Sequence, residues 1–99
     1  MPTYVLAFRG QQDRAAGAEQ EAAWGRWFGE IGPRVVDSGN RLGRATMVGE
    51  ASAEMVMTGY TLIEADSYEA AVEVAKGCPG LNNGGAVEVG ETIPSLSAA

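Results

Sequence analysis

Hydrophobic residues follow two different periods in the N-terminal part of this chain. Residues 4–8 are rich in β-formers and carry apolar side chains on both alternating faces, which predicts a strand buried on both sides. From about Ala18 the apolar positions recur at helical spacing, which predicts an amphipathic helix. The stripe of this helix consists of Trp24, Trp27, Phe28, Ile31 and Val35. Pro33 predicts a kink there, or a fresh turn that begins at the proline.

Two further strands are predicted at residues 41–48 and 55–64, on either side of a polar loop at 49–54. Neither face of the later strand is polar, which is typical of a strand covered on both sides. Strict alternation places Met55, Met57 and Ile63 on one face, and Val56, Tyr60 and Leu62 on the other.

A second helix is predicted at about residues 67–77. Asp66 is its expected N-cap, and Glu69 three residues later completes a capping box. Gly77 and Pro79 end the helix. Its buried stripe consists of Ala71, Val74, Ala75 and Cys78. A short alternating strand is predicted at 86–89, and residues 93–99 are predicted to be a flexible tail.

This order of elements predicts an α+β fold of the ferredoxin-like βαββαβ type, in a single domain at residues 1–92. Right-handed crossovers place both helices on one face of an antiparallel sheet and leave the other face open. Because the strands carry apolar residues on that open face as well, its exposure to water would be unfavourable. We therefore expect a homodimer that pairs through the sheet face and forms a dimeric α/β barrel.

Composition narrows the chemistry that the chain can perform. The net charge of −6 disfavours nucleic-acid binding. Because the chain has no histidine and only one cysteine, we expect neither a metal site nor another cofactor, and Cys78 has no partner for an internal disulfide. Neither a signal peptide nor a membrane helix is evident, so we expect no membrane association and a cytoplasmic location.

Several segments in sequence order resemble the YCII-related family of small dimeric α/β-barrel proteins, including its DGPF-type branch. They cover most of the chain from residue 4 to residue 89. The segments are Tyr4-Val5-Leu6, Trp24-x-x-Trp27-Phe28, Asp37-Ser38-Gly39-Asn40-Arg41-Leu42-Gly43, Gly59-Tyr60, Ala75-x-x-Cys78-Pro79-Gly80 and Gly85-Ala86-Val87-Glu88-Val89.

The resemblance implies a ferredoxin-like fold, a homodimer and a pocket beside the sheet. Most of the family has no assigned activity, and some members are lyase-like enzymes associated with a His/Asp pair. This sequence has no histidine for that role and lacks the DGPF tetrapeptide. The resemblance therefore implies an architecture, whereas the catalytic chemistry of those members does not carry over.

Three aromatic residues of the first helix are candidates for lining a ligand pocket. Trp24, Trp27 and Phe28 offer flat apolar surfaces to a planar ligand. The same continuous stripe equally describes the buried seam of an amphipathic helix. The two interpretations are compatible, because the walls of ligand pockets are largely apolar.

Three polar or charged residues are candidates for catalytic or ligand-binding roles. Asp37 is a candidate general base, although it lies in an Asp-Ser-Gly-Asn segment that is also typical of turns. Tyr60 is the polar side chain that we expect to reach a cavity, as a ligand-binding or catalytic group. Arg44, on the same side of its predicted strand as Leu42, is a candidate for gripping a carboxylate, and a surface salt bridge is the alternative.

These observations leave three functions open. The first is binding of a small aromatic or carboxylate ligand in a pocket beside the sheet. The second is a cofactor-free lyase or isomerase that acts on a small organic substrate. The third is an accessory or regulatory protein that acts through its surface.

Overall fold

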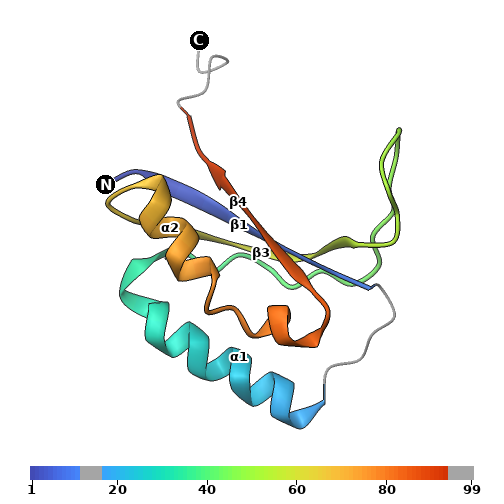
Figure 1. Ribbon diagram of the computed structural model, residues 1–99, viewed down its shortest axis with the longest axis horizontal. Coiled ribbons are helices and arrows are strands. Elements are labelled where there is room, and N and C mark those ends of the chain that lie inside the picture. The colour runs from blue at the N-terminus through green and yellow to red at the C-terminus, as the bar shows by residue number, and fades with distance from the viewer. Residues whose placement is uncertain (12–16, 94–99) are drawn as a thin grey trace.

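The computed structural model describes residues 1–11 and 17–93 of the chain. It contains an antiparallel sheet of four strands, in the order β2-β3-β1-β4, and two α-helices on one side of that sheet (Figure 1). The strands are β1 Thr3–Gly10, β2 Val35–Asp37, β3 Val56–Glu64 and β4 Ala86–Glu91. The helices are α1 Ala18–Ile31 and α2 Tyr68–Ala75, with the short 3-10 helices η1 Gly32–Arg34 and η2 Pro79–Asn83. The predicted α+β class is confirmed, and this arrangement is compatible with a ferredoxin-like fold.

Strand β1 divides its side chains between the two faces of the sheet as predicted. Tyr4, Leu6 and Phe8 lie in the core beneath the helices, and none is more than 7% exposed. Val5 and Ala7 lie on the opposite, open face, where they are paired across the ladder with β3. The buried core beneath the helices is completed by Trp27, Ile31, Ile63, Ala65, Ala71, Ala75 and Cys78.

Helix α1 begins at Ala18, as its periodicity predicts, and ends at Ile31. A fresh turn forms at Pro33 as one of the two interpretations predicts, although it begins one residue earlier, because η1 starts at Gly32 and Pro33 is its second residue. The prediction that Val35 continues the helical stripe is wrong. Val35 is the first residue of β2, because the turn at Pro33 redirects the chain towards the edge of the sheet.

The predicted strand at residues 41–48 is wrong. The edge of the sheet beside β3 is instead occupied by β2, which ends at Asp37, and by one isolated bridge between Arg41 and Gly59. An edge strand needs a partner along its length, and after the hydrogen bond from Leu42 N to Thr58 O, residues 43–50 form no ladder with β3. They form part of a long loop that projects from the sheet between β2 and β3 (Figure 1).

Strand β3 carries a bulge that changes the predicted faces. The register slips between Phe8 and Arg9 of β1, so that Gly59 pairs with Phe8 and Met57 pairs with Arg9, and Thr58 is the extra residue. Val56 therefore lies on the helix-covered face and is buried at 5% exposure, although strict alternation places it with Tyr60 on the open face. A single inserted residue shifts a strand by half its side-chain period, which exchanges the two faces.

Helix α2 is shorter than predicted and has a different N-cap. The Ser67 hydroxyl accepts a hydrogen bond of 3.0 Å from the backbone N–H of Ala70, so the cap follows Asp66 by one residue. The capping box with Glu69 therefore does not apply. Ser and Asp both cap helices well, and the extended backbone of Ser67 (φ −156°, ψ 166°) decides between the two neighbours.

Residues 12–16 and residues 94–99, the latter in the predicted tail, lie outside the described residues. Within the described ranges, no helix has the length and apolar character needed to cross a membrane.

Candidate ligand-binding cleft

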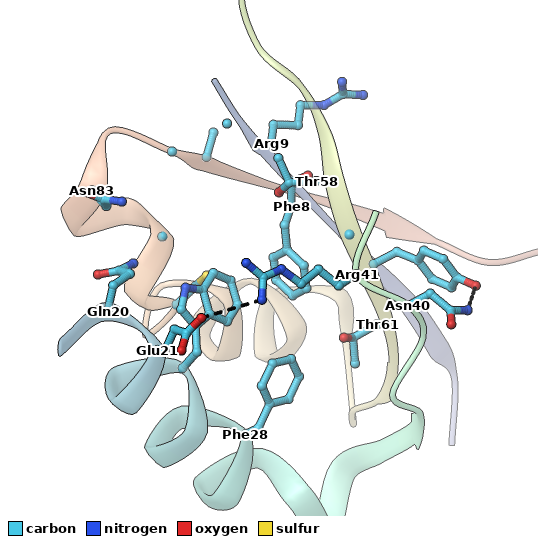
Figure 2. Close-up of a pocket in the computed structure, with 18 of the residues that line it drawn as sticks. Phe8, Arg9, Gln20, Glu21, Phe28, Asn40, Arg41, Thr58, Thr61 and Asn83 are labelled. Carbon is cyan, nitrogen blue, oxygen red and sulfur yellow. Dashed lines mark hydrogen bonds and ion pairs between the residues drawn. The ribbon is translucent and has the colours of Figure 1, made fainter. Parts of the chain in front are cut away.

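A cleft of about 770 Å³ lies between α1, η2 and the adjoining end of the sheet (Figure 2). Its floor is aromatic, and its rim is polar. The residues on α1 that line it are Gln20, Glu21, Trp24 and Phe28, and those on the sheet include Phe8, Thr58 and Thr61. The connecting segments contribute Asn40, Arg41, Cys78 and Asn83, among others.

The aromatic floor is built around Phe8 of β1. Its ring meets that of Trp24 edge to face, with centroids 5.0 Å apart and planes at 83°. Phe28 completes the floor and stacks on Trp24 at 5.9 Å with an interplanar angle of 28°. These large side chains stand between α1 and the strands, and the backbone of α1 packs mainly against η2. The space left between helix and sheet is the cleft.

The two tryptophans of the predicted aromatic site have different roles. Trp24 is half-buried and lines the cleft. Trp27 is only 4% exposed, belongs to the core and does not line the cleft. Its indole Nε1 lies beside Gly77, where an added Cβ would approach to 3.1 Å. The structure thus places Trp24 and Phe28 in the candidate site and assigns Trp27 to its support.

The far wall of the cleft is held against α1 by one side-chain contact and one close approach. Gln20 on α1 donates a hydrogen bond of 3.0 Å from its Nε2 to the carbonyl oxygen of Pro79 in η2. Gly80 follows, and a Cβ at this position would lie 3.2 Å from Trp24 Cζ2. The absence of a side chain at Gly80 thus lets η2 approach the indole closely.

Cys78 is buried where the end of α2 leads into η2, and it contributes to the cleft lining. Burial raises the pKa of its thiol, and the backbone hydrogen bonds of Gly80 and Leu81 oppose that shift in part. A thiol of this kind is protonated at neutral pH and is a poor nucleophile.

The bulge of β3 borders the cleft. The Thr58 hydroxyl donates a hydrogen bond of 3.3 Å to the carbonyl oxygen of Phe8. Thr58 itself lines the cleft, together with Gly59 and Thr61. Bulges are common beside binding sites because they redirect side chains there.

Two glycines allow the segment around Arg41 to lie flat against β3. Gly39 has a φ of +71°, and a Cβ at this position would lie 1.8 Å from the carbonyl oxygen of Tyr60. A Cβ at Gly59 would lie 3.1 Å from the carbonyl oxygen of Asn40. The segment is then fixed on either side of Arg41, by hydrogen bonds from Leu42 N to Thr58 O (2.9 Å) and from Tyr60 N to Asn40 O (3.3 Å).

Arg41 extends from this segment across the mouth of the cleft towards α1. Its bridge partner, Gly59, has no side chain to obstruct it, and both residues lie on the helix-covered face. The guanidinium Nη1 lies 3.8 Å from Glu21 Oε1, and the two side chains are 80% and 61% exposed (Figure 2). Arg41 and Glu21 are therefore the charged groups that face each other above the aromatic floor.

The polar residues that the sequence singled out are only partly brought together. The Tyr60 hydroxyl accepts a hydrogen bond of 2.9 Å from Asn40 Nδ2, and both residues contribute to the lining at one end of the cleft. Asp37 does not line the cleft, and its Oδ1 accepts a hydrogen bond of 2.8 Å from the Gly39 N–H, as in an Asx turn. Arg44 is exposed in the projecting loop and does not line the cleft either.

Sequence reasoning missed Arg41, Glu21 and Gln20 as members of the site. Glu21 and Gln20 lie outside the apolar stripe of the predicted helix, so the periodicity gives no reason to single them out. For Arg41, the available signal was the pair of glycines Gly39 and Gly59, because a glycine in or beside a strand permits a close backbone approach.

Within residues 1–11 and 17–93, no group of three or more Cys, Asp or Glu side chains gathers to hold a metal ion. No protein-family model matches the chain, and a search of curated proteins found no significant match.

Proposed function

We propose that this protein binds a small, flat and predominantly apolar molecule in the cleft between α1, η2 and the sheet. The observation that carries this proposal is the aromatic floor of Phe8, Trp24 and Phe28 beneath an open space of about 770 Å³. That volume lies within the usual range of ligand pockets, about 300–1,000 Å³. Flat aromatic surfaces favour planar ligands, which stack on one ring and meet the edge of another.

The alternative of a cofactor-free lyase or isomerase has less support. Its two candidate groups were Asp37 and Tyr60. The carboxylate of Asp37 is engaged in a turn outside the cleft, and the Tyr60 hydroxyl is held by Asn40. No described side chain in the cleft is placed beside another as a nucleophile and its base would be.

A neutral planar probe tests the binding proposal. N-phenyl-1-naphthylamine becomes more fluorescent in an apolar site, and we expect a saturable increase with the wild-type protein. Trp24→Ala and Phe28→Ala remove parts of the floor, and each is expected to weaken binding about tenfold, the equivalent of about 1.4 kcal/mol.

The matched control is Val36→Thr, which changes an exposed residue on β2 outside the cleft. It should leave the affinity for the probe unchanged. If Val36→Thr weakens binding whereas Trp24→Ala and Phe28→Ala do not, the probe binds elsewhere on the surface and the proposal is wrong.

We also propose that the chain pairs with a second copy through the open face of the sheet, as the resemblance to the YCII-related family implies. The centre of that face is apolar, with Val5, Ala7 and Leu62 neighbouring one another across the ladder. Val36 on the adjoining edge strand is 53% exposed. Burial of such a face contributes roughly 25 cal/mol per Å² of apolar area.

Light scattering coupled to size-exclusion chromatography tests this pairing. The expected mass is about twice the 10.3 kDa of the chain. Leu62→Asp should give a monomer, because an unpaired carboxylate within an apolar interface is strongly unfavourable. Val48→Asp is the control, because Val48 is 89% exposed in the projecting loop. A wild-type protein that elutes as a monomer at micromolar concentration would overturn this part of the proposal.

A further inference from the structure

We infer that the ligand of the cleft is a planar aromatic monocarboxylate, whose carboxylate group binds Arg41 in exchange for Glu21. This inference rests on the proposed binding function and adds the charge of the ligand, the residue that recognises it and the residue that is displaced.

The position of Arg41 relative to the aromatic floor suggests a ligand with two chemical ends. The backbone on either side of Arg41 is fixed to β3, so the origin of this side chain is well defined, whereas its guanidinium is 80% exposed and able to change partner. The guanidinium reaches across the cleft towards Glu21, on the side of α1 that also carries Phe28 (Figure 2). A ligand ring on that floor therefore directs a substituent at its edge towards Arg41.

The present partner of Arg41 is held weakly. The distance of 3.8 Å to Glu21 exceeds the 2.7–2.9 Å that is usual for a charge-assisted hydrogen bond, so the two groups attract each other without a close contact. Exposed ion pairs of this type contribute little to stability. A ligand carboxylate that accepts two parallel N–H groups from the guanidinium gives a shorter and better-directed interaction.

The other charges of the cleft restrict the anion to a single carboxylate. Arg9 also lines the cleft, but its Nε and Nη2 already donate to Glu88 Oε1 at 3.1 and 2.9 Å. Among the described residues that line the cleft, Arg41 is therefore the cation that is not already hydrogen-bonded to a carboxylate. Glu21 remains close to the bound anion, and the chain has a net charge of −6. A dianion such as a phosphate monoester is disfavoured in these surroundings.

The test compares 2-naphthoate with 2-naphthamide, a neutral compound of nearly the same shape, each displacing N-phenyl-1-naphthylamine. The wild-type protein is expected to bind the carboxylate about five- to tenfold more tightly than the amide at low salt. Arg41→Gln should abolish that preference and leave the affinity for the amide unchanged. Glu21→Gln should strengthen naphthoate binding about two- to threefold, because it removes a competing anion.

Two further arginines sharpen the result. Arg26→Gln is the control, because Arg26 is exposed on α1 and does not line the cleft. Arg44→Gln distinguishes the two candidate arginines, since the sequence favours Arg44 and the structure favours Arg41. Loss of the preference in Arg44→Gln, or its retention in Arg41→Gln, would overturn the inference.

The outcomes distinguish a failure of this inference from a failure of the proposed binding function. Equal affinity for the acid and the amide, with binding that still depends on Trp24, contradicts only the role of Arg41. If neither compound displaces the probe and the probe itself does not depend on Trp24, the proposed function fails as well.

Discussion

The two helices cover the same face of the sheet in different ways. The buried residues of α2 are small, with Ala71 at 0% and Ala75 at 5% exposure, and its backbone packs directly against β1 and β4. Helix α1 presents Trp24, Trp27 and Phe28 instead, and its backbone packs mainly against η2 (Figure 1). Small side chains close the space beneath α2, whereas large rings hold α1 away from the strands and leave a cleft.

The N-terminal ends of the two helices also differ, because only α2 has a side-chain cap. Helix α2 has a side-chain cap, in which the Ser67 hydroxyl accepts the N–H of Ala70. Helix α1 has Gly17 at its N-cap and no side-chain cap hydrogen bond. Near that end, Gln20 bonds to the carbonyl of Pro79 in the cleft wall instead. The N-terminal turn of α1 is therefore fixed partly by the same contacts that shape the cleft.

The largest expected effect comes from breaking the core beneath α1 rather than the cleft. Trp27→Ala should lower the free energy of unfolding by about 3–5 kcal/mol, because a buried indole is lost and a cavity remains. Trp24→Ala should cost about 1–2 kcal/mol, since this ring is half-buried and already borders open space. Urea unfolding followed by circular dichroism measures both values.

A reversed order would show that Trp24 is the structural residue and Trp27 the accessible one. Because a loss of 3–5 kcal/mol is a large part of the stability of a typical domain, the milder pair Trp27→Leu and Trp24→Leu serves if Trp27→Ala does not fold. The same ordering is expected for that pair.

The second-largest expected effect on stability tests how tightly the space beneath α2 is filled, since Ala71 is fully buried there. Ala71→Leu adds three carbon atoms where no exposed space remains, and it should cost about 1–3 kcal/mol. Ala22→Leu on α1 is the matched control, because Ala22 is exposed, and its effect should stay within about 0.5 kcal/mol. An equally small effect at both positions would mean that α2 can move away from the sheet and make room for the larger side chain.

Two glycines provide a finer test, since each lies against one of the tryptophans. A Cβ at Gly77 would lie 3.1 Å from the buried Trp27, and one at Gly80 would lie 3.2 Å from the half-buried Trp24. Alanine restricts the unfolded chain and stabilises by about 0.4–1 kcal/mol where the folded site can accept it. We expect Gly80→Ala to be neutral or stabilising, because Trp24 can move into the cleft, and Gly77→Ala to be destabilising by about 1 kcal/mol.

The same pair has a second readout. If Trp24 moves into the cleft in Gly80→Ala, the affinity for N-phenyl-1-naphthylamine should fall, whereas Gly77→Ala should leave it unchanged. Destabilisation by Gly80→Ala equal to that by Gly77→Ala would show that the wall of the cleft is as rigid as the core.

The parts of the fold that the sequence predicts are those with a strong period of their own. The stripe of α1 repeats over several residues and identifies one buried face, and the unbroken apolar run at residues 4–8 identifies β1 as a strand with no polar face. The edge strand β2 has only three residues, and its position depends on competition for the edge of β3, which no local pattern records. The bulge at Thr58 likewise has no local signature, yet it reverses the faces of Val56 and Met57.

The candidate site, like the fold, could be predicted only in part from the sequence. The aromatic floor follows from the helical stripe, although periodicity alone does not separate Trp24 from Trp27. The choice between Arg44 and Arg41 depended on the predicted strand at 41–48. Without that strand, the side-chain direction at each position is set by contacts with β3, and only Arg41 bridges to Gly59.

The smallest expected effect is a pH dependence that separates the two sides of the core. Burial raises the pKa of Cys78, at the cleft side, above its ordinary value of 9.0, and burial followed by Glu91 and Glu69 raises the pKa of Tyr4, beneath α2. Above pH 9 the unfolded chain loses the thiol proton while the folded protein retains it. The unfolded state then binds fewer protons, so the free energy of unfolding falls as the pH rises.

Removal of each group in turn assigns this fall in stability to its source. Cys78→Ala should flatten the decline that begins near pH 9, whereas Tyr4→Phe should flatten only the part that begins near pH 10, which are the ordinary pKa values of the two groups. The slopes are compared rather than the absolute stabilities, because both substitutions also change core packing. If Cys78→Ala keeps the full slope above pH 9, the thiol ionises as easily in the folded protein as in the unfolded chain. The wall of the cleft at Cys78 would then be open to water. Cys78 would in that case belong with the loosely filled space beneath α1 and not with the closely packed space beneath α2.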